Sequence, residues 1–253
     1  MRMKYDFSFL TAQPVAHRGL HGGEIPENSL SAFEEAAAKG YSVETDVQMT
    51  KDGELVLFHD DDLLRMCGVD KKVAACTYAQ LCSLRLKNSQ EKIPLLSDLL
   101  QRIGGRVPLL IELKHQPNAK TNVFLKKVAE ELKDYRGTYA LQSFHPAYVK
   151  GCKKLFPQIP CGILATAHPK KADLGGGAFW KLKAHLVKHM SLNFWSKPDF
   201  ISFLFCDYPT KETEKFKGAK LAWTVRTPQE EAYARKYADN IIFEGFLPEK
   251  TVV

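Results

Sequence analysis

Apolar and polar residues alternate along residues 41–49, which is the period-two pattern of a half-buried β-strand. The polar face of this strand carries Glu44 and Asp46, so their carboxylates project side by side. Neighbouring carboxylates repel each other unless a cation or a proton lies between them. The pattern therefore predicts a strand whose polar face favours a hard divalent cation with oxygen ligands.

A hairpin is predicted directly after this strand. The turn at residues 51–53 contains an Asp-Gly pair, which favours tight hairpins, and the apolar run at residues 55–58 is typical of a return strand. The return strand would deliver His59 and Asp60 to the neighbourhood of the two carboxylates. An imidazole beside a metal site is the combination that a metal-assisted hydrolase needs.

The remaining chain alternates strand patterns with helix patterns. Besides the return strand, eight strands are expected, at residues 14–19, 41–49, 107–114, 138–144, 162–165, 200–205, 221–225 and 240–244. Helical spacing is found at residues 30–40, 95–103, 122–135, 146–155, 179–190 and 228–237, and in a Lys/Glu-rich segment before Leu221. Eight such units predict a TIM (β/α)8 barrel. A doubly wound sheet is the alternative, but it brings the ends of the first, second, third and last strands to one mouth less readily.

One segment departs from this alternation. Residues 61–97 contain scattered cysteines and only a short helical pattern. We interpret this segment as a small insertion after the second strand, and residues 1–253 as a single barrel domain that carries it.

A second acidic position lies inside the continuous apolar run of residues 107–114, which is typical of a parallel strand buried on both faces. Glu112 and Lys114 share one face of this strand. A charge in such a run is costly without a partner, so Glu112 is a stronger functional candidate than a surface carboxylate.

The composition is that of an ordinary globular chain with a net positive charge. The 253 residues are 45% hydrophobic, and 36 Lys and Arg against 29 Asp and Glu give a net charge of +7. The lysines are dispersed and no nucleic-acid motif is present, so we expect no nucleic-acid partner. A mild attraction for phosphates remains compatible with this charge.

The six cysteines show no CxxC spacing or pairing with histidine, and we expect buried free thiols rather than a zinc site. The N-terminal residues lack the apolar core and cleavage site of a signal peptide, and no apolar run reaches the length of about 18 residues that a membrane span needs. We therefore expect a cytoplasmic protein without stable membrane insertion.

Several motifs resemble those of the glycerophosphodiester phosphodiesterase family. They run in order over nearly the whole chain: HRG at residues 17–19, PENSLSAF at 26–33, ETDVQMTKDGELVLFHD at 44–60, IELK at 111–114, and the weaker QSFHP at 142–146 and WTV at 223–225. The resemblance implies a TIM-barrel hydrolase that cleaves a small-molecule glycerophosphodiester to glycerol 3-phosphate and an alcohol, with Ca²⁺ or Mg²⁺ bound.

The resemblance also implies roles for individual residues. Carried onto the matching positions, Glu44, Asp46 and Glu112 would be the metal ligands, and His17 and His59 the acid and base pair, without an assignment of which is which. Carried over in the same way, the residues that would hold the phosphate or line the substrate pocket are Arg18, Lys114 and Trp223.

Two positions depart from the family pattern. Glu244 stands where a Thr-Asp-Pro-like segment is usual, and Arg226 stands where an Asn commonly follows the Trp-Thr-Val segment. Both are expected near the barrel mouth, where they would affect head-group preference. Glu244 would contact a cationic or polyol group, or else form a salt bridge with Arg226 or a lysine.

Two other functions remain open. A lysophospholipid or sphingolipid phosphodiesterase is supported by Phe179, Phe194 and Trp195, expected near the mouth. A non-catalytic phosphodiester-binding barrel would not need both histidines. The aromatic and basic segment 179–195 could form a membrane-surface helix, but its helical spacing, with Leu182, Leu186 and Met190, favours an outer barrel helix. The head-group alcohol, the choice of ion and the oligomeric state are left open.

Overall fold

A closed barrel of eight parallel strands forms the centre of the molecule, in a computed structural model that describes residues 8–116, 119–169 and 180–249. The barrel strands are β1 (Val15–Ala16), β2 (Ser42–Met49), β4 (Leu109–Leu113), β5 (Tyr139–Ser143), β6 (Cys161–Ala165), β7 (Phe200–Leu204), β8 (Ala219–Val225) and β9 (Asn240–Phe243). β1 pairs in parallel with both β2 and β9, which closes the barrel. The predicted TIM barrel is therefore confirmed.

The hairpin after the second strand is also present. β3 (Leu55–Leu57) runs antiparallel to β2, with Val47 opposite Leu57, and lies outside the barrel order. Its apolar residues are fully buried, and Phe58 N donates a hydrogen bond to Asp46 O over 3.0 Å. The next residue, His59, is thereby brought next to the strand that carries the acidic pair.

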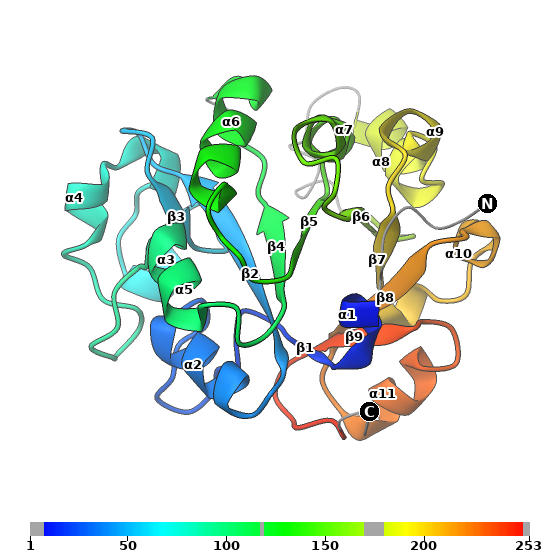
Figure 1. Cartoon of the computed structure of the whole chain (residues 1–253), viewed down its shortest axis with the longest axis horizontal. Helices are drawn as coiled ribbons and strands as arrows, with labels where there is room; N and C mark the ends of the chain where they lie inside the picture. The colour runs from blue at the N-terminus through cyan, green and yellow to red at the C-terminus, as the bar shows by residue number, and fades with distance from the viewer. Residues whose placement is uncertain (1–7, 117–118, 170–179, 250–253) are drawn as a thin grey trace.

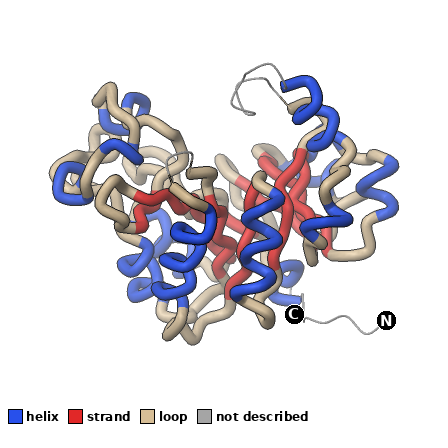
Figure 2. Tube along the Cα trace, turned by 90° about the horizontal axis from the view of Figure 1, so that it is seen from above, coloured by secondary structure: helices blue, strands red, loops and turns tan. Residues whose placement is uncertain are grey.

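Helices surround the barrel (Figures 1 and 2). They are α1 (Ser8–Ala12), α2 (Leu30–Ala38), α3 (Leu64–Cys67), α4 (Tyr78–Leu81), α5 (Leu96–Ile103), α6 (Thr121–Leu132), α7 (Pro146–Leu155), α8 (Trp180–Lys188), α9 (Asn193–Ser196), α10 (Lys211–Lys215) and α11 (Pro228–Ala234), with 3₁₀ turns at Val73–Ala75 and Phe205–Asp207. None of these helices is both long and apolar enough to cross a membrane.

Two apolar layers stabilise the barrel because successive strand side chains point to opposite faces. The larger cluster joins the outer strand faces to the helices, and includes Phe33 and Phe124. The smaller cluster includes Leu110 and Phe200, together with Leu10 of α1. The short N-terminal helix was not predicted from the sequence, because its five residues are too few for a clear helical period.

Residues 61–97 form a lobe beside β3, which is the cyan segment with α3 and α4 at one side of Figure 1. A third apolar cluster fills the lobe and joins it to the hairpin, with Phe58, Leu63 and Leu81 among its buried members. The predicted insertion after the second strand is confirmed.

The segment before β7 differs in part from the prediction. Residues 170–179, which include the glycine-broken loop and Phe179, lie outside the described residues. Met190 joins the large core cluster, but Leu182 of α8 is 57% exposed instead of packing on the barrel. Phe194 and Trp195 lie in or beside α9, which directly precedes β7 and so lies at the N-terminal end of the strands. The expectation that these aromatic residues stand near the mouth is wrong, because the mouth is formed by the opposite strand ends.

Candidate active site

Three buried carboxylates meet on the inner face of β2 and β4. The two strands pair in parallel with Asp46 opposite Glu112, and Glu44 lies two residues before Asp46 on the same face. One oxygen from each of Glu44, Asp46 and Glu112 lies within 4.8 Å of the others. The strand register therefore brings together the three acidic residues that the sequence singled out.

The local charges of this cluster are unequal. Burial and the nearby carboxylates of Asp46 and Glu112 raise the pKa of Glu44 well above its ordinary value. Burial also favours protonation of Asp46, but Lys114, His59 and Arg18 outweigh it and lower the Asp46 pKa. The repulsion within the cluster is therefore greatest at Glu44, where the nearby Arg18 charge offsets it only in part.

The donor set fits a hard divalent cation. All three groups offer carboxylate oxygens, which Ca²⁺ and Mg²⁺ prefer. Asp46 Oδ1 is buried and accepts no hydrogen bond within the described part of the chain, and Lys114 Nζ lies 3.5 Å from it. An added cation would engage this oxygen and relieve the repulsion that raises the Glu44 pKa.

The loop after β1 wraps around the acidic cluster. Arg18 and Asn28 both adopt left-handed backbone conformations, with φ of 56° and 54°. The Arg18 backbone N–H donates to Glu44 Oε2 over 2.9 Å, and Asn28 Nδ2 donates to Asp46 Oδ2 over 3.0 Å. Gly19 allows the close turn, since an added Cβ there would lie 2.7 Å from the Ala32 carbonyl carbon.

Two cations balance the cluster. Lys114 Nζ lies 3.0 Å from Glu112 Oε1, and the Glu112 and Asp46 carboxylates raise the lysine pKa although burial alone would lower it. The Arg18 guanidinium pairs with Glu27 over 2.7 Å and has its Nε 3.3 Å from Asp46 Oδ2. Both side chains remain charged at neutral pH and can attract a phosphate.

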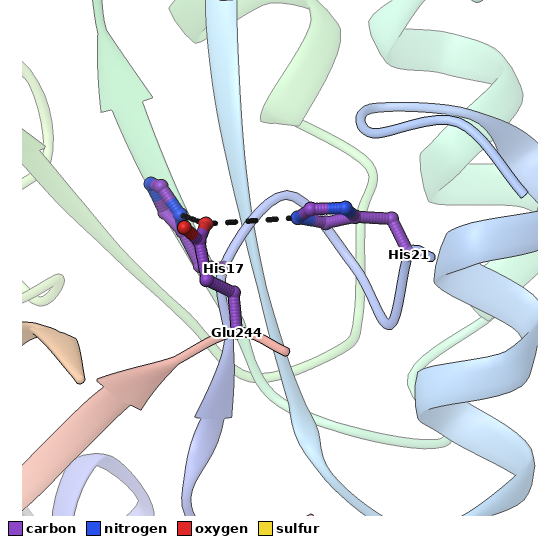
Figure 3. A group of neighbouring side chains, drawn as sticks. All are labelled: His17, His21 and Glu244. Carbon is purple, nitrogen blue, oxygen red and sulfur yellow. Dashed lines mark hydrogen bonds and ion pairs between the residues drawn. The ribbon is translucent and has the colours of Figure 1, made fainter. Parts of the chain in front are cut away.

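His17, at the end of β1, is held by a carboxylate from the last strand end. His17 Nδ1 lies 2.6 Å from Glu244 Oε2, and His21 Nε2 lies 3.7 Å from the same oxygen. Figure 3 shows both imidazole rings pointing toward the Glu244 carboxylate. Arg226 Nε donates to the other Glu244 oxygen over 2.7 Å. The salt bridge between Glu244 and Arg226 was one of the predicted alternatives, whereas the contact with His17 was not predicted.

These contacts fix the protonation states of the pair. Burial favours protonation of Glu244, but the hydrogen bond from His17 and the nearby His21 ring outweigh it and lower the Glu244 pKa. Burial lowers the His17 pKa, and the bond to Glu244 offsets only part of this effect. His17 is therefore neutral at neutral pH, with its proton on Nδ1 facing the ionised Glu244, and its Nε2 is the nitrogen available for proton transfer.

His59 is held in the same way by its neighbour. His59 Nδ1 lies 2.8 Å from Asp60 Oδ1, and Arg65 Nε of the insertion donates to Asp60 Oδ2 over 2.6 Å. Arg65 also donates two hydrogen bonds to Glu27, over 2.7 and 2.8 Å. One guanidinium thus connects the insertion, the His59 segment and the loop after β1.

Trp223 of β8 packs against the smaller apolar cluster of the barrel. Its indole Nε1 donates to Ser202 O over 2.9 Å, and its ring meets Phe144 edge to face with centroids 5.5 Å apart. Phe144 follows β5 at the C-terminal end of the strands. Trp223 and Phe144 thus form an aromatic surface beside the mouth, and the family resemblance implies a pocket-lining role for Trp223.

The sequence thus singled out the three acidic residues, both histidines, Arg18 and Lys114, which the structure places around one site, while the residues that orient them were missed. Glu27 and Asn28 belong to the PENSLSAF motif, so this motif is the sequence signal that could have identified them. Glu244 is far from His17 in the chain, so only barrel closure reveals their contact.

Comparisons with known proteins agree with this fold. A phosphodiesterase of Oleispira antarctica, solved in complex with the product sn-glycerol-3-phosphate, superposes with a TM-score of 0.76 at 23% sequence identity, and the match covers 93% of both chains. This likeness concerns the fold.

Curated relatives are similar over part of the chain. The glycerophosphodiester phosphodiesterase of Bacillus altitudinis is 32% identical over 160 residues, which is 59% of this chain and 64% of the relative. Lysophospholipase D GDPD1 of Mus musculus is 32% identical over 135 residues, which is 48% of this chain and 41% of the relative. Each alignment spans less than two thirds of the relative.

The family model of the glycerophosphoryl diester phosphodiesterase family matches residues 17–243. This range begins at the histidine that follows β1 and ends with the last residue of β9, so it covers the barrel and the insertion. The chain belongs to the glycerophosphoryl diester phosphodiesterase family.

Proposed function

We propose that the protein is a metal-dependent phosphodiesterase that hydrolyses glycerophosphodiesters to glycerol 3-phosphate and an alcohol. The observation that carries this proposal is the pair of carboxylate-bound histidines, His17 and His59, which lie close enough to the acidic cluster to influence Asp46 when they are protonated. Family membership and the glycerol 3-phosphate bound to the Oleispira antarctica structure support the substrate class.

The three carboxylates of Glu44, Asp46 and Glu112 would hold the divalent ion, Ca²⁺ or Mg²⁺. When bound, the ion would neutralise charge on the non-bridging phosphate oxygens and help to orient the diester. Arg18 offers a planar guanidinium and Lys114 a compact charge toward the same phosphate, which would otherwise be repelled by the acidic cluster.

The two histidines would move the protons. One imidazole Nε2 would accept the proton of the attacking hydroxyl, either water or a glycerol hydroxyl of the substrate, as the new P–O bond forms. The other, in its protonated form, would donate a proton to the leaving alkoxide oxygen as the old P–O bond breaks. Attack by the glycerol hydroxyl would give a cyclic phosphate, which water would then open to glycerol 3-phosphate in a second step with the roles of the two histidines exchanged. The carboxylates of Glu244 and Asp60 would keep each ring oriented, because they bind the opposite ring nitrogen.

The first experiment measures release of glycerol 3-phosphate from glycerophosphocholine, glycerophosphoethanolamine and glycerophosphoglycerol. We expect EDTA to abolish release and Ca²⁺ or Mg²⁺ to restore it. His17→Ala and His59→Ala should each lower kcat by at least about 100-fold, since acid-base groups contribute that much. His189→Ala is the matched control, because His189 pairs with Glu212 on the barrel exterior. No release by folded, metal-loaded wild type would overturn the proposal.

A second substrate class is favoured by one observation. The half-exposed Phe144 packs on Trp223 at the mouth, and the similar mouse protein is named a lysophospholipase D. Lysophosphatidylcholine distinguishes the two classes by its products, because its hydrolysis would release choline and lysophosphatidic acid instead of glycerol 3-phosphate. Turnover of the lysolipid at a higher kcat/KM than that of the water-soluble diesters would make it the preferred substrate.

We also propose a cytoplasmic location, because all six cysteines are free thiols and free thiols persist in reducing compartments. Non-reducing electrophoresis of protein purified with a thiol-blocking reagent should show six blocked cysteines. A disulfide in the freshly trapped protein would contradict this location.

A further inference from the structure

A hollow of about 520 Å³ lies on the outside of the barrel, between α7 and α9. Its lining contains four lysines and two aromatic residues, and no acidic side chain. These residues are Lys150, Lys153, Lys154, Lys197, Phe194 and Trp195. We call this surface the basic-aromatic patch.

The charge of the patch is only partly balanced. Lys153 forms an ion pair with Asp199, which leaves Lys150, Lys154 and Lys197 as the exposed lysines of the patch. Lys197 ends α9 in a left-handed conformation with φ of 49°, where a glycine would be unstrained. The patch therefore presents concentrated positive charge to solvent.

The aromatic side chains are unusually exposed for their size. Phe194 is 76% exposed and Trp195 is 40% exposed. Lys150 Nζ lies 4.1 Å from the centre of the Trp195 ring, so a cation–π contact holds the indole beside the lysines. Burying the exposed surface of Phe194 and Trp195 in an apolar environment would be favourable.

We propose that the basic-aromatic patch docks the protein on membranes rich in anionic phospholipid. Lysines attract the negative lipid head groups, while Trp and Phe enter the boundary between head groups and acyl chains. A free phosphate ion would account for the lysines but would leave Phe194 without a role. An acidic protein surface would satisfy the charge, but it would not require an aromatic residue to project as far as Phe194 does.

The basic-aromatic patch and the candidate active site lie at different ends of the barrel strands. α9 directly precedes β7 and lies at the N-terminal end of the strands, whereas the candidate active site opens at their C-terminal end. Residues of the patch contribute nothing to the site described above. Variants of the patch should therefore keep their activity toward water-soluble diesters, which makes this proposal independent of the proposed function.

The experiment is sedimentation of the full chain with vesicles at low salt. We expect binding to vesicles of equal parts phosphatidylglycerol and phosphatidylcholine, at least tenfold weaker binding to pure phosphatidylcholine, and a decrease as salt screens the charges. Lys150→Glu with Lys154→Glu, and Phe194→Ser with Trp195→Ser, should each weaken binding at least tenfold. Lys215→Glu with Lys217→Glu is the control with the same change of charge elsewhere.

The outcomes separate the possible occupants. Thermal unfolding of each variant, monitored by circular dichroism, verifies that it is folded. Failure of the wild type to sediment with anionic vesicles, or equal loss of binding in the control, would overturn the proposal. Binding that millimolar inorganic phosphate abolishes at constant ionic strength, and that survives the Phe194 and Trp195 changes, would identify a phosphate site instead.

Discussion

His17 and His59 reach the site from different parts of the chain but are held by the same device. Each imidazole contacts a carboxylate through Nδ1, Glu244 for one and Asp60 for the other, at 2.6 and 2.8 Å. A guanidinium then holds each carboxylate, from Arg226 and Arg65. Each histidine is thus the end of a chain of charge-assisted hydrogen bonds, which fixes its ring and leaves Nε2 for chemistry.

Glu244→Gln tests the chain that ends at His17. The amide removes the charge that favours protonated His17, so the His17 pKa should fall and the limb of the kcat/KM profile that reports His17 should move to lower pH. We expect kcat to fall by about ten- to a hundredfold, because the ring loses its fixed orientation. Glycerophosphodiester hydrolysis measured from pH 5 to pH 9 checks both effects.

Glu230→Gln is the matched control for this prediction. Glu230 accepts a hydrogen bond from the Arg226 backbone N–H over 2.6 Å but does not contact His17. Its pH profile should match that of the wild type. A Glu244→Gln variant that loses stability but retains the wild-type profile would show that Glu244 supports the fold and does not tune His17.

Among single residues, the predictable ones are those whose position in the fold follows from their neighbours in the sequence. The alternation of β2 placed Glu44 and Asp46 on one face, and the apolar run around Glu112 marked it as a buried charge. The Glu244 contact depends on barrel closure, and the roles of Arg18 and Asn28 depend on left-handed backbone angles. Nothing in the residue pattern specifies such angles at non-glycine positions.

Among the elements, the insertion is joined to the barrel by one side chain. Arg65 of α3 binds Glu27 in the loop after β1 and Asp60 beside His59. Burial favours protonation of Glu27, but the hydrogen bonds from Arg65 and the nearby Arg18 charge lower the Glu27 pKa to about 2. The insertion therefore holds the carboxylate beside His59 and the loop after β1 in place.

Arg65→Lys should separate this role from folding. Lysine keeps the charge but cannot donate to Glu27 and Asp60 at the same time with the geometry of a guanidinium. We expect kcat to fall about tenfold because His59 is less well oriented, with less than about 1 kcal/mol lost in the free energy of unfolding because Arg65 is largely exposed. Steady-state kinetics and urea unfolding measure the two quantities.

The control is Arg106→Lys, since Arg106 forms a similar two-pronged pair with Glu34 over 2.7 and 2.8 Å, on the outside of the barrel. It should match Arg65→Lys in stability and the wild type in kcat. Equal losses of kcat in both variants would remove Arg65 from any positioning role.

Element prediction succeeded where period and length were clear. The eight barrel strands follow from alternating or continuous apolar runs, with boundaries that moved by a few residues. β1 shrank from the predicted residues 14–19 to Val15–Ala16, because the chain turns at Arg18 to reach the acidic cluster. The short α1 and α9 contain too few residues to display a helical period, so their positions depend on tertiary contacts.

For the whole molecule, closure depends on the N-terminal segment. β1 contributes only Val15 and Ala16 but bridges β2 and β9, and Leu10 of α1 belongs to the same apolar cluster as Val15. Asn240 Nδ2 of β9 donates to Leu10 O and Gln13 O, both over 2.7 Å. Through these contacts the first described residues pack as an integral part of the barrel.

Leu10→Ala tests whether this segment shares the cooperative unfolding of the barrel. Leu10 is 2% exposed and belongs to the smaller apolar cluster, so its truncation should cost about 2–4 kcal/mol through lost burial and a residual cavity. Because β1 closes the ring, unfolding should remain a single transition at a lower midpoint, with kcat at 25 °C unchanged. Leu247→Ala, at a residue that is 59% exposed, should change stability by less than about 0.5 kcal/mol. A separate early transition in Leu10→Ala, with the main midpoint unmoved, would instead mean that the barrel remains folded after α1 detaches.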